Sequence, residues 1–225
     1  MLIAGGLASA ASAQLAGSIS VQNDYRVRGY TISGDKPAAI LGLSYDHSTG
    51  LYANGSVIGA LDHDNDPVVL GAIGNIGYAR RIGTRISIDA GYARTQYTHY
   101  VAAAHGNAHY DEIYAGISAG GLSAHVYVSP DYYRHDVSTI YGELDGAVKP
   151  VGEWRLTGHI GVLGYLAEPR YLSLGTQYDW RVGVARPIGH FDLHLSLTGG
   201  GPGSDYYRDH RHSKTALVGG ISWFF

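Results

Sequence analysis

The chain has 225 residues and a formal net charge of −3, with 33 glycines and 19 tyrosines but only three phenylalanines, one methionine and no cysteine. This balance lacks the basic patch of a nucleic-acid-binding protein, so we expect no nucleic-acid partner. No apolar stretch approaches the roughly 20 residues of a membrane-spanning helix, and the absence of cysteine is compatible with an oxidising compartment.

The first segment, residues 1–13, predicts a secretory signal peptide. A short apolar run is followed by Ala11-Ser12-Ala13, an A-x-A-like cleavage site, which makes Gln14 the expected first mature residue. The run lacks the basic residues that usually precede it, and we interpret this as a start that is either truncated or assigned too late in the sequence. We expect residues 14–225 to form one domain.

The rest of the chain divides into twelve candidate strands, several of which alternate clearly between apolar and polar residues. In one of them the leucines at 193, 195 and 197 alternate with polar residues. A period of two over many residues indicates strands between two unlike environments. The strands are expected at residues 17–31, 37–47, 50–61, 68–81, 85–97, 109–119, 121–132, 138–149, 153–165, 176–187, 190–199 and 214–225.

The connections between these strands are alternately short and long. The short ones fall at 47–50, 82–84, 120–121, 150–152 and 188–189, and the long polar ones at 32–36, 62–67, 98–108, 133–137, 166–175 and 200–213. Outer-membrane barrels have short periplasmic turns and long outer loops, whereas a soluble β-sandwich has no reason to alternate in this way. The sequence therefore predicts an all-β fold, a single closed antiparallel transmembrane β-barrel of about 12 strands with both termini periplasmic.

The last strand places an apolar set on one face, ending in Trp223 and Phe225. Aromatic residues of this kind form girdles at the membrane interfaces of such barrels. We expect the girdle side chains to contact outer-membrane lipid and lipopolysaccharide, and the barrel-assembly machinery to recognise Phe225. The girdle candidates are Tyr178, Trp180, Trp223 and Phe225.

The opposite parity of the strands carries the charges. An arginine exposed to lipid at mid-bilayer costs about 2–4 kcal/mol, so these side chains are expected to point into the lumen. The set contains eight acids and four arginines, which predicts a net negative potential. The charges either line a solute route or form paired ladders that fill the barrel. The predicted lumen-lining residues are Asp24, Arg26, Arg28, Asp46, Asp89, Glu112, Glu143, Asp145, Arg155, Asp179, Arg181 and Asp192.

Metal and catalytic sites have weak signals in this sequence. The Asp62–Asp66 run and the Asp205–His212 run contain carboxylates and histidines, but neither has the spacing of a calcium loop or a zinc site, so we interpret both as solvated loops. Serine–histidine neighbours such as His125 and Ser129 arise in any sheet rich in both, and no G-x-S-x-G, H-E-x-x-H or P-loop motif occurs. We expect no metal, no cofactor and no enzymatic activity.

Several segments resemble one known family. Asn23-Asp-Tyr-Arg-Val-Arg-Gly29 is similar to the opening D-Y-R-x-R-G motif of the TorF-type porin family of proteobacterial outer-membrane β-barrels. Residues 37–45, 48–52, 111–118 and 128–133 are similar to further segments of that family. The resemblance implies a single-chain outer-membrane barrel that acts as a channel, with no catalytic residues to carry over.

The expected function follows from the barrel's size. Twelve strands about 4.8 Å apart, tilted by roughly 40°, give a backbone diameter near 24 Å, of which side chains leave about half open. We expect a porin-like channel in the cell outer membrane for passive diffusion of small polar solutes or ions. The alternative is a non-conducting barrel with a plugged lumen, either a lipid-modifying enzyme or a structural protein.

Overall fold

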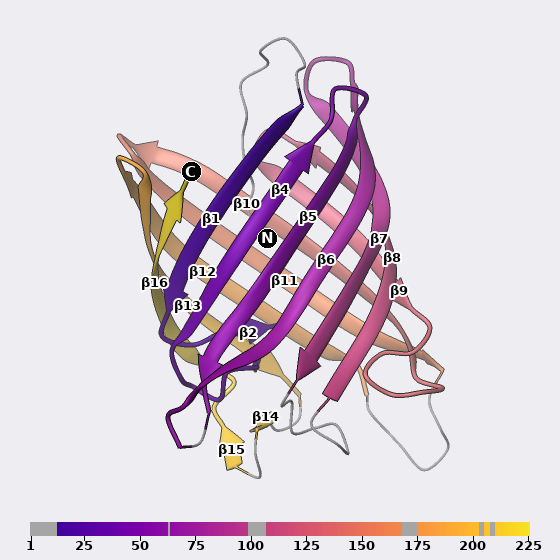
Figure 1. Ribbon diagram of the computed structural model, residues 1–225. Coiled ribbons are helices and arrows are strands. Elements are labelled where there is room, and N and C mark those ends of the chain that lie inside the picture. The colour runs from indigo at the N-terminus through magenta and orange to yellow at the C-terminus, as the bar shows by residue number, and fades with distance from the viewer. Residues whose placement is uncertain (1–12, 63, 99–106, 168–174, 203–204, 208–209) are drawn as a thin grey trace.

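The computed structural model describes residues 13–62, 64–98, 107–167, 175–202, 205–207 and 210–225, and it shows a closed antiparallel barrel (Figure 1). Each strand pairs with the next along the chain, and β16 closes the barrel by pairing with β1. The twelve barrel strands are β1 (Gln14–Gln22), β4 (Ala38–Asp46), β5 (Leu51–Leu61), β6 (Pro67–Ile82), β7 (Ile86–Thr98), β8 (Asn107–Ala119), β9 (Leu122–Ser129), β10 (Ser138–Val151), β11 (Trp154–Ala167), β12 (Gln177–Ile188), β13 (Phe191–Gly201) and β16 (Ala216–Phe224). No helix among these residues is long and apolar enough to cross a bilayer.

The predicted strand number, closure and alternation of connections are confirmed. The short turns gather at one end of the barrel, together with the start of β1 and the end of β16, and we call this the short-turn end. The longer connections and two small hairpins lie at the opposite, long-loop end (Figure 1). The predicted signal peptide lies outside the described residues except for Ala13.

The predicted first strand, 17–31, is wrong beyond Gln22. After Gln22, the side chain of Asn23 replaces the backbone as the partner of β16. It accepts a hydrogen bond from the Gly219 amide at 2.8 Å and donates one to the Leu217 carbonyl at 3.0 Å. The chain then leaves the wall and forms the hairpin of β2 (Arg26–Val27) and β3 (Tyr30–Thr31) before β4 begins.

The barrel wall separates an apolar outer face from a polar inner face. Outward side chains such as Ile113 and Val182 are about two-thirds exposed, at 65% and 64%, in an apolar belt. Residues of the opposite parity contact one another across neighbouring strands, as Glu143 and His125 do from paired positions on β10 and β9. An apolar outside and polar inside are what a barrel in lipid requires.

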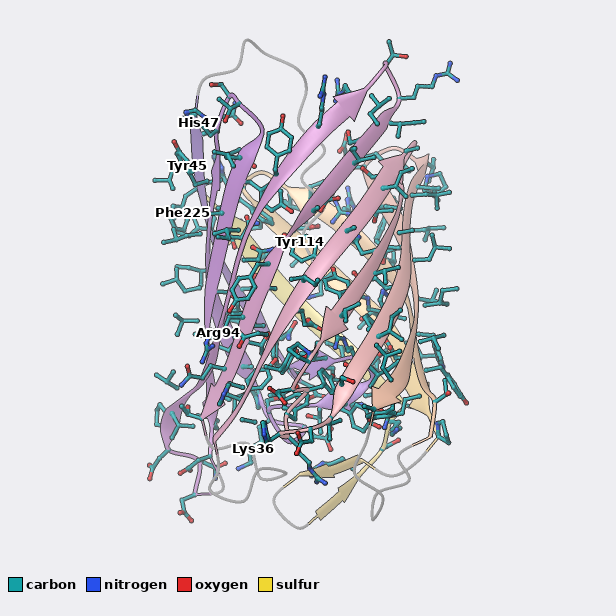
Figure 2. The ribbon with its side chains drawn as sticks, turned by 90° about the vertical axis from the view of Figure 1, so that its right-hand side faces the viewer. Lys36, Tyr45, His47, Arg94, Tyr114 and Phe225 are labelled. Carbon is teal, nitrogen blue, oxygen red and sulfur yellow. The ribbon has the colours of Figure 1, made fainter. Side chains whose placement is uncertain are left out.

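The interior at the long-loop end is packed rather than open. The connection from β1 to β4 and the segment between β9 and β10 contribute Ile32, Tyr132 and Val137 to a buried cluster. In Figure 2, side chains crowd this end, which Lys36 marks, while Phe225 lies toward the short-turn end. The cluster consists of Ile32, Ala38, Ile58, Ala60, Leu70, Tyr97, Tyr110, Tyr132, Val137, Tyr141 and Leu163.

Candidate functional site

The β2–β3 hairpin places one arginine in the interior. Its two-residue turn consists of Arg28 and Gly29, with φ angles of 50° and 80°. Positive φ at both positions defines the tight turn that suits twisted hairpins, where Asn, Asp and Gly are usual. An arginine in this conformation is strained and is held there by its surroundings.

Those surroundings are an acid and four aromatic rings. The Arg28 Nη2 donates to Glu112 Oε1 at 2.7 Å, and both side chains are almost completely buried. The guanidinium carbon lies 4.0 Å from the centre of the Tyr141 ring, and three further rings lie within 5.9 Å. Each such cation–π contact is worth about 0.5–2 kcal/mol. The tyrosine cage, as we call it, comprises Tyr110, Tyr127, Tyr132 and Tyr141.

The other charges of this segment are paired locally. Asp24 accepts from the Arg26 guanidinium and from the Thr31 hydroxyl, the latter at 2.6 Å. Arg26 also donates to Asp35 at 2.8 Å, and Asp35 contacts His212 of β15. Partial burial raises the pKa of the Asp35 carboxyl, but the hydrogen bond and charge of His212 and the charge of Arg26 outweigh it, so this pKa lies below its ordinary value.

The prediction that Asp24, Arg26 and Arg28 share one face of a barrel strand is therefore wrong. The ladder ends at Asn23, so backbone parity no longer governs where these side chains point. Arg26 is paired with Asp24 and Asp35, and Arg28 is paired with Glu112.

A second group of interior charges lies next to the cage, and we call it the acid–histidine row. The His125 Nε2 lies 3.3 Å from Asp89, and the two ring nitrogens of His159 lie 3.0 Å from Asp145 and 2.8 Å from Asp179. On β9 and β10 these residues are closer to the short-turn end than the cage tyrosines are. The row comprises Asp89, His125, Glu143, Asp145, His159 and Asp179.

Two glycines create the space for the row. Gly116 lies in register between Asp89 and His125, and a Cβ there would stand 2.2 Å from the imidazole. Gly161 lies between Glu143 and Asp179, and a Cβ there would stand 2.7 Å from the Asp179 carboxylate. Because neither position carries a side chain, His125 reaches Asp89 and Tyr141 reaches Asp179 from two strands away.

Arg155, Arg181 and Asp192, which were also predicted to line the lumen, form two further pairs. Arg155 is paired with Asp192. Arg181 approaches Asp145 at 3.7 Å and is 44% exposed. Sequence reasoning named the acids but gave His125 no role beside them and did not single out His159; the inward parity of both histidines was the available signal.

The four girdle candidates all point away from the interior. The rings of Trp223 and Phe225 lie 4.8 Å apart near the short-turn end, tilted by 34°, and the Phe225 ring occupies the space above Gly17. Tyr178 is 53% exposed, and Trp180 lies against Gly199 toward the long-loop end.

The acidic run at Asp62–Asp66 is held together by its own hydrogen bonds. Asp62 accepts the amides of Asp64 and Asp66 at 2.9 Å, and Lys36 donates to the Asn65 side chain. These oxygens therefore organise the loop. His63 and Asp209, which belonged to the two candidate metal runs, lie outside the described residues.

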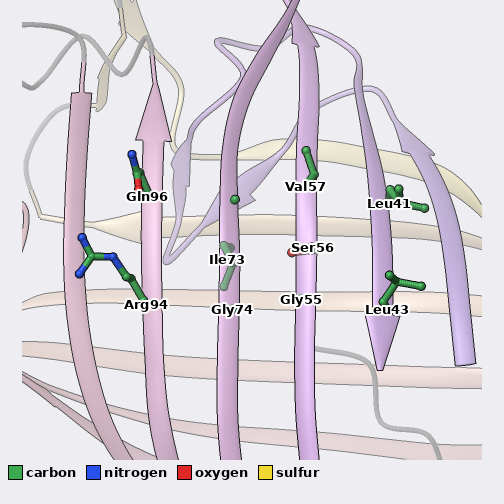
Figure 3. A pocket seen from close by; sticks show the side chains of 10 residues that line it. Leu41, Leu43, Gly55, Ser56, Val57, Ile73, Gly74, Arg94 and Gln96 are labelled. Atoms are coloured by element: carbon green, nitrogen blue, oxygen red, sulfur yellow. The ribbon is translucent and has the colours of Figure 1, made fainter. Parts of the chain in front are cut away.

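A shallow depression also marks the outer wall (Figure 3). It spans β4 to β7, where small residues such as Gly55 and Gly74 lie between longer side chains. At its edge Arg94 is paired with Asp111 at 3.0 Å. The depression faces away from the lumen and lies on no route through the barrel.

Comparisons with solved structures agree on the architecture. The KdgM porin aligns with 10% sequence identity and a TM-score of 0.56, covering 93% of this chain and 99% of that chain. A structure titled "KdgM porin in complex with disordered oligogalacturonate" aligns with 10% identity and a TM-score of 0.54, covering 95% and 99%. At this identity the likeness is one of fold. No curated protein matches the chain.

Family membership follows from the sequence match. A family model covers residues 7–200, which is more than half of the chain. The match does not carry the TorF-type name, so that resemblance stays a prediction. The chain belongs to the Gcw_chp family, described as "Bacterial protein of unknown function".

Proposed function

We propose that this protein is a porin-like outer-membrane channel through which small polar solutes or ions diffuse passively. The observation that supports this proposal is a closed barrel with an apolar outer belt, inside which several charged side chains remain partly exposed. Arg181 is 44% exposed, Arg155 33% and Asp89 19%, although all three point away from the belt. Charges that stay partly exposed within a barrel are the feature expected of a water-filled lumen.

The balance of charge favours cations and neutral solutes. The predicted interior charges comprise eight acids and four arginines, and two of those arginines are paired with Asp24 and Glu112. A lumen with surplus carboxylates repels anions by the field of its walls.

The packing of the interior at the long-loop end restricts the route. The hairpin carries Arg28 into the tyrosine cage, and the buried cluster around Ile32 and Tyr97 packs beside it. We infer that this hairpin sets the conductance of the channel.

A closed barrel is the second candidate function, and the same packing favours it. Tyr97 and Ile58 have no exposed surface, which is unusual for inward side chains of an open pore. A structural barrel plugged by its own hairpin would bury these residues permanently.

Planar-bilayer recordings test both candidates. We expect discrete conductance steps from the wild type, and larger steps after deletion of residues 26–31, which form the hairpin. The outward substitution Ile113→Ala serves as a control and should leave the steps unchanged. A silent wild type with a conducting deletion variant would favour the plugged barrel, and silence of both would overturn the channel.

A further inference from the structure

Three side chains from β10 and β11 converge within the acid–histidine row, and a fourth from β9 approaches one of them. Glu143, Asp145 and His159 each offer one ligand atom, and these atoms all lie within 4.8 Å of one another. His125 joins them from β9, with its Nδ1 4.0 Å from Glu143 Oε1. We call these four residues the histidine–carboxylate cluster.

We propose that the histidine–carboxylate cluster binds a first-row divalent transition-metal ion such as Zn²⁺. Imidazole nitrogens suit zinc, copper and nickel, and zinc also accepts carboxylate oxygens. The proposal goes beyond channel function, because binding at this site does not require the barrel to conduct.

The hydrogen bonds of both imidazoles favour this assignment. His159 directs Nε2 to Asp179 at 2.8 Å, and His125 directs Nε2 to Asp89 at 3.3 Å. A histidine that donates one ring nitrogen to a carboxylate presents the other as a lone pair, which is the usual arrangement behind metal-bound histidines. The second nitrogen is Nδ1 in both residues. In His125 it lies 4.0 Å from Glu143, and in His159 it lies 3.0 Å from Asp145.

The state of His125 is a separate indication of a ligand. Its side chain is only 5% exposed, and its buried Nδ1 has no hydrogen-bond partner among the described residues. A buried polar atom without a partner costs about 1–3 kcal/mol. A metal ion shared with Glu143 would remove that cost.

Two of the separations within the cluster already suit ligands of one cation. Ligand atoms about 2.0–2.2 Å from one cation lie roughly 3–4 Å apart. The Nδ1 of His159 already lies 3.0 Å from Asp145, and the His125–Glu143 separation is 4.0 Å. Gly116 and Gly161 carry no side chains, so the His125 ring lies over one of them and the Tyr141 hydroxyl and Asp179 carboxylate lie over the other.

Isothermal titration of ZnCl₂ into the untagged full chain in detergent tests the site. We expect a single Zn²⁺ per barrel, bound about tenfold or more weakly after His159→Ala or Glu143→Gln, and about 10–100-fold more weakly after Asp179→Asn, which removes the outer carboxylate. His194→Ala is the matched control, because His194 also points inward but lies outside the cluster.

Several outcomes would overturn the proposal. Two protonated histidines could balance the same carboxylates, and in that case the wild type binds no Zn²⁺. Equal Zn²⁺ affinity in wild type and Glu143→Gln would mean that the ion binds elsewhere. Glu143→Gln preserves the side-chain volume, so it tests the site even if His159→Ala fails to fold. Visible absorption of bound Co²⁺, lost in Glu143→Gln and kept in His194→Ala, gives an independent readout. A barrel that binds Zn²⁺ without conducting keeps this site and overturns only the channel.

Discussion

At the residue scale, Arg28 combines an unfavourable backbone with an extensive set of side-chain contacts. We predict that Arg28→Asn destabilises the barrel although asparagine suits the turn better. The loss leaves Glu112 buried without its partner, which costs about 3–5 kcal/mol. Urea unfolding followed by tryptophan fluorescence measures this, and the double variant Arg28→Asn with Glu112→Gln should recover most of the loss. A single variant as stable as the wild type would contradict the prediction.

Phe225 and Phe224 form a matched pair at the carboxyl terminus. Phe225 continues the ladder by exchanging two backbone hydrogen bonds with Gly17, and its ring covers that glycine on the outer face. Phe224 has the opposite parity. We predict that Phe225→Ala reduces the amount of heat-modifiable barrel in outer-membrane fractions more than Phe224→Ala does. Equal loss in the two variants would exclude a special role for the outward terminal ring in lipid contact or in recognition by the assembly machinery.

At the scale of elements, a pair of charges joins the turn before β4 to the small hairpin of β14 (Asp205–Tyr207) and β15 (His210–His212). Because folding lowers the pKa of Asp35, its stabilisation is present above the unfolded value near 3.9 and is lost as pH falls through the folded value. We predict that Asp35→Asn lowers the melting temperature at neutral pH, and that the difference from wild type shrinks in acid. Asp64→Asn, in a neighbouring loop, serves as the control for removing a loop carboxylate.

The strands were predictable because their signal is local. Alternation and turn composition are present in each segment, so strand number and the rhythm of the connections followed from the sequence. The β2–β3 hairpin was not predictable, because Tyr25 to Arg28 keep the alternation of a strand. What ends the ladder is the bonding of Asn23 to Leu217 and Gly219, which are nearly 200 residues away.

At the scale of the whole molecule, the interior partners depend on register around the barrel. Parity predicted a face for Asp89 and Glu143 but could not show that His125 lies between them. That contact needs the pairing of four successive strands, with Gly116 at the crossing point. The tyrosine cage could not be predicted from the sequence either, because it surrounds Arg28, which belongs to the β2–β3 hairpin and not to a barrel strand.

The inside–outside assignment of the whole wall makes a final prediction about selectivity. Arg181 and Arg94 are both about half-exposed, at 44% and 49%, but Arg181 approaches Asp145 in the lumen and Arg94 pairs with Asp111 on the outer wall. We predict that Arg181→Ala shifts the reversal potential across a salt gradient toward greater cation preference, because it removes a fixed positive charge from the route. Arg94→Ala should leave the reversal potential unchanged. The difference should be largest at low ionic strength, where the Debye length is tens of ångströms rather than about 10 Å and the fixed charge is screened least. A shift in Arg94→Ala would contradict the inside–outside assignment of the wall. No shift in Arg181→Ala would mean that ions do not pass along the face that carries the acid–histidine row.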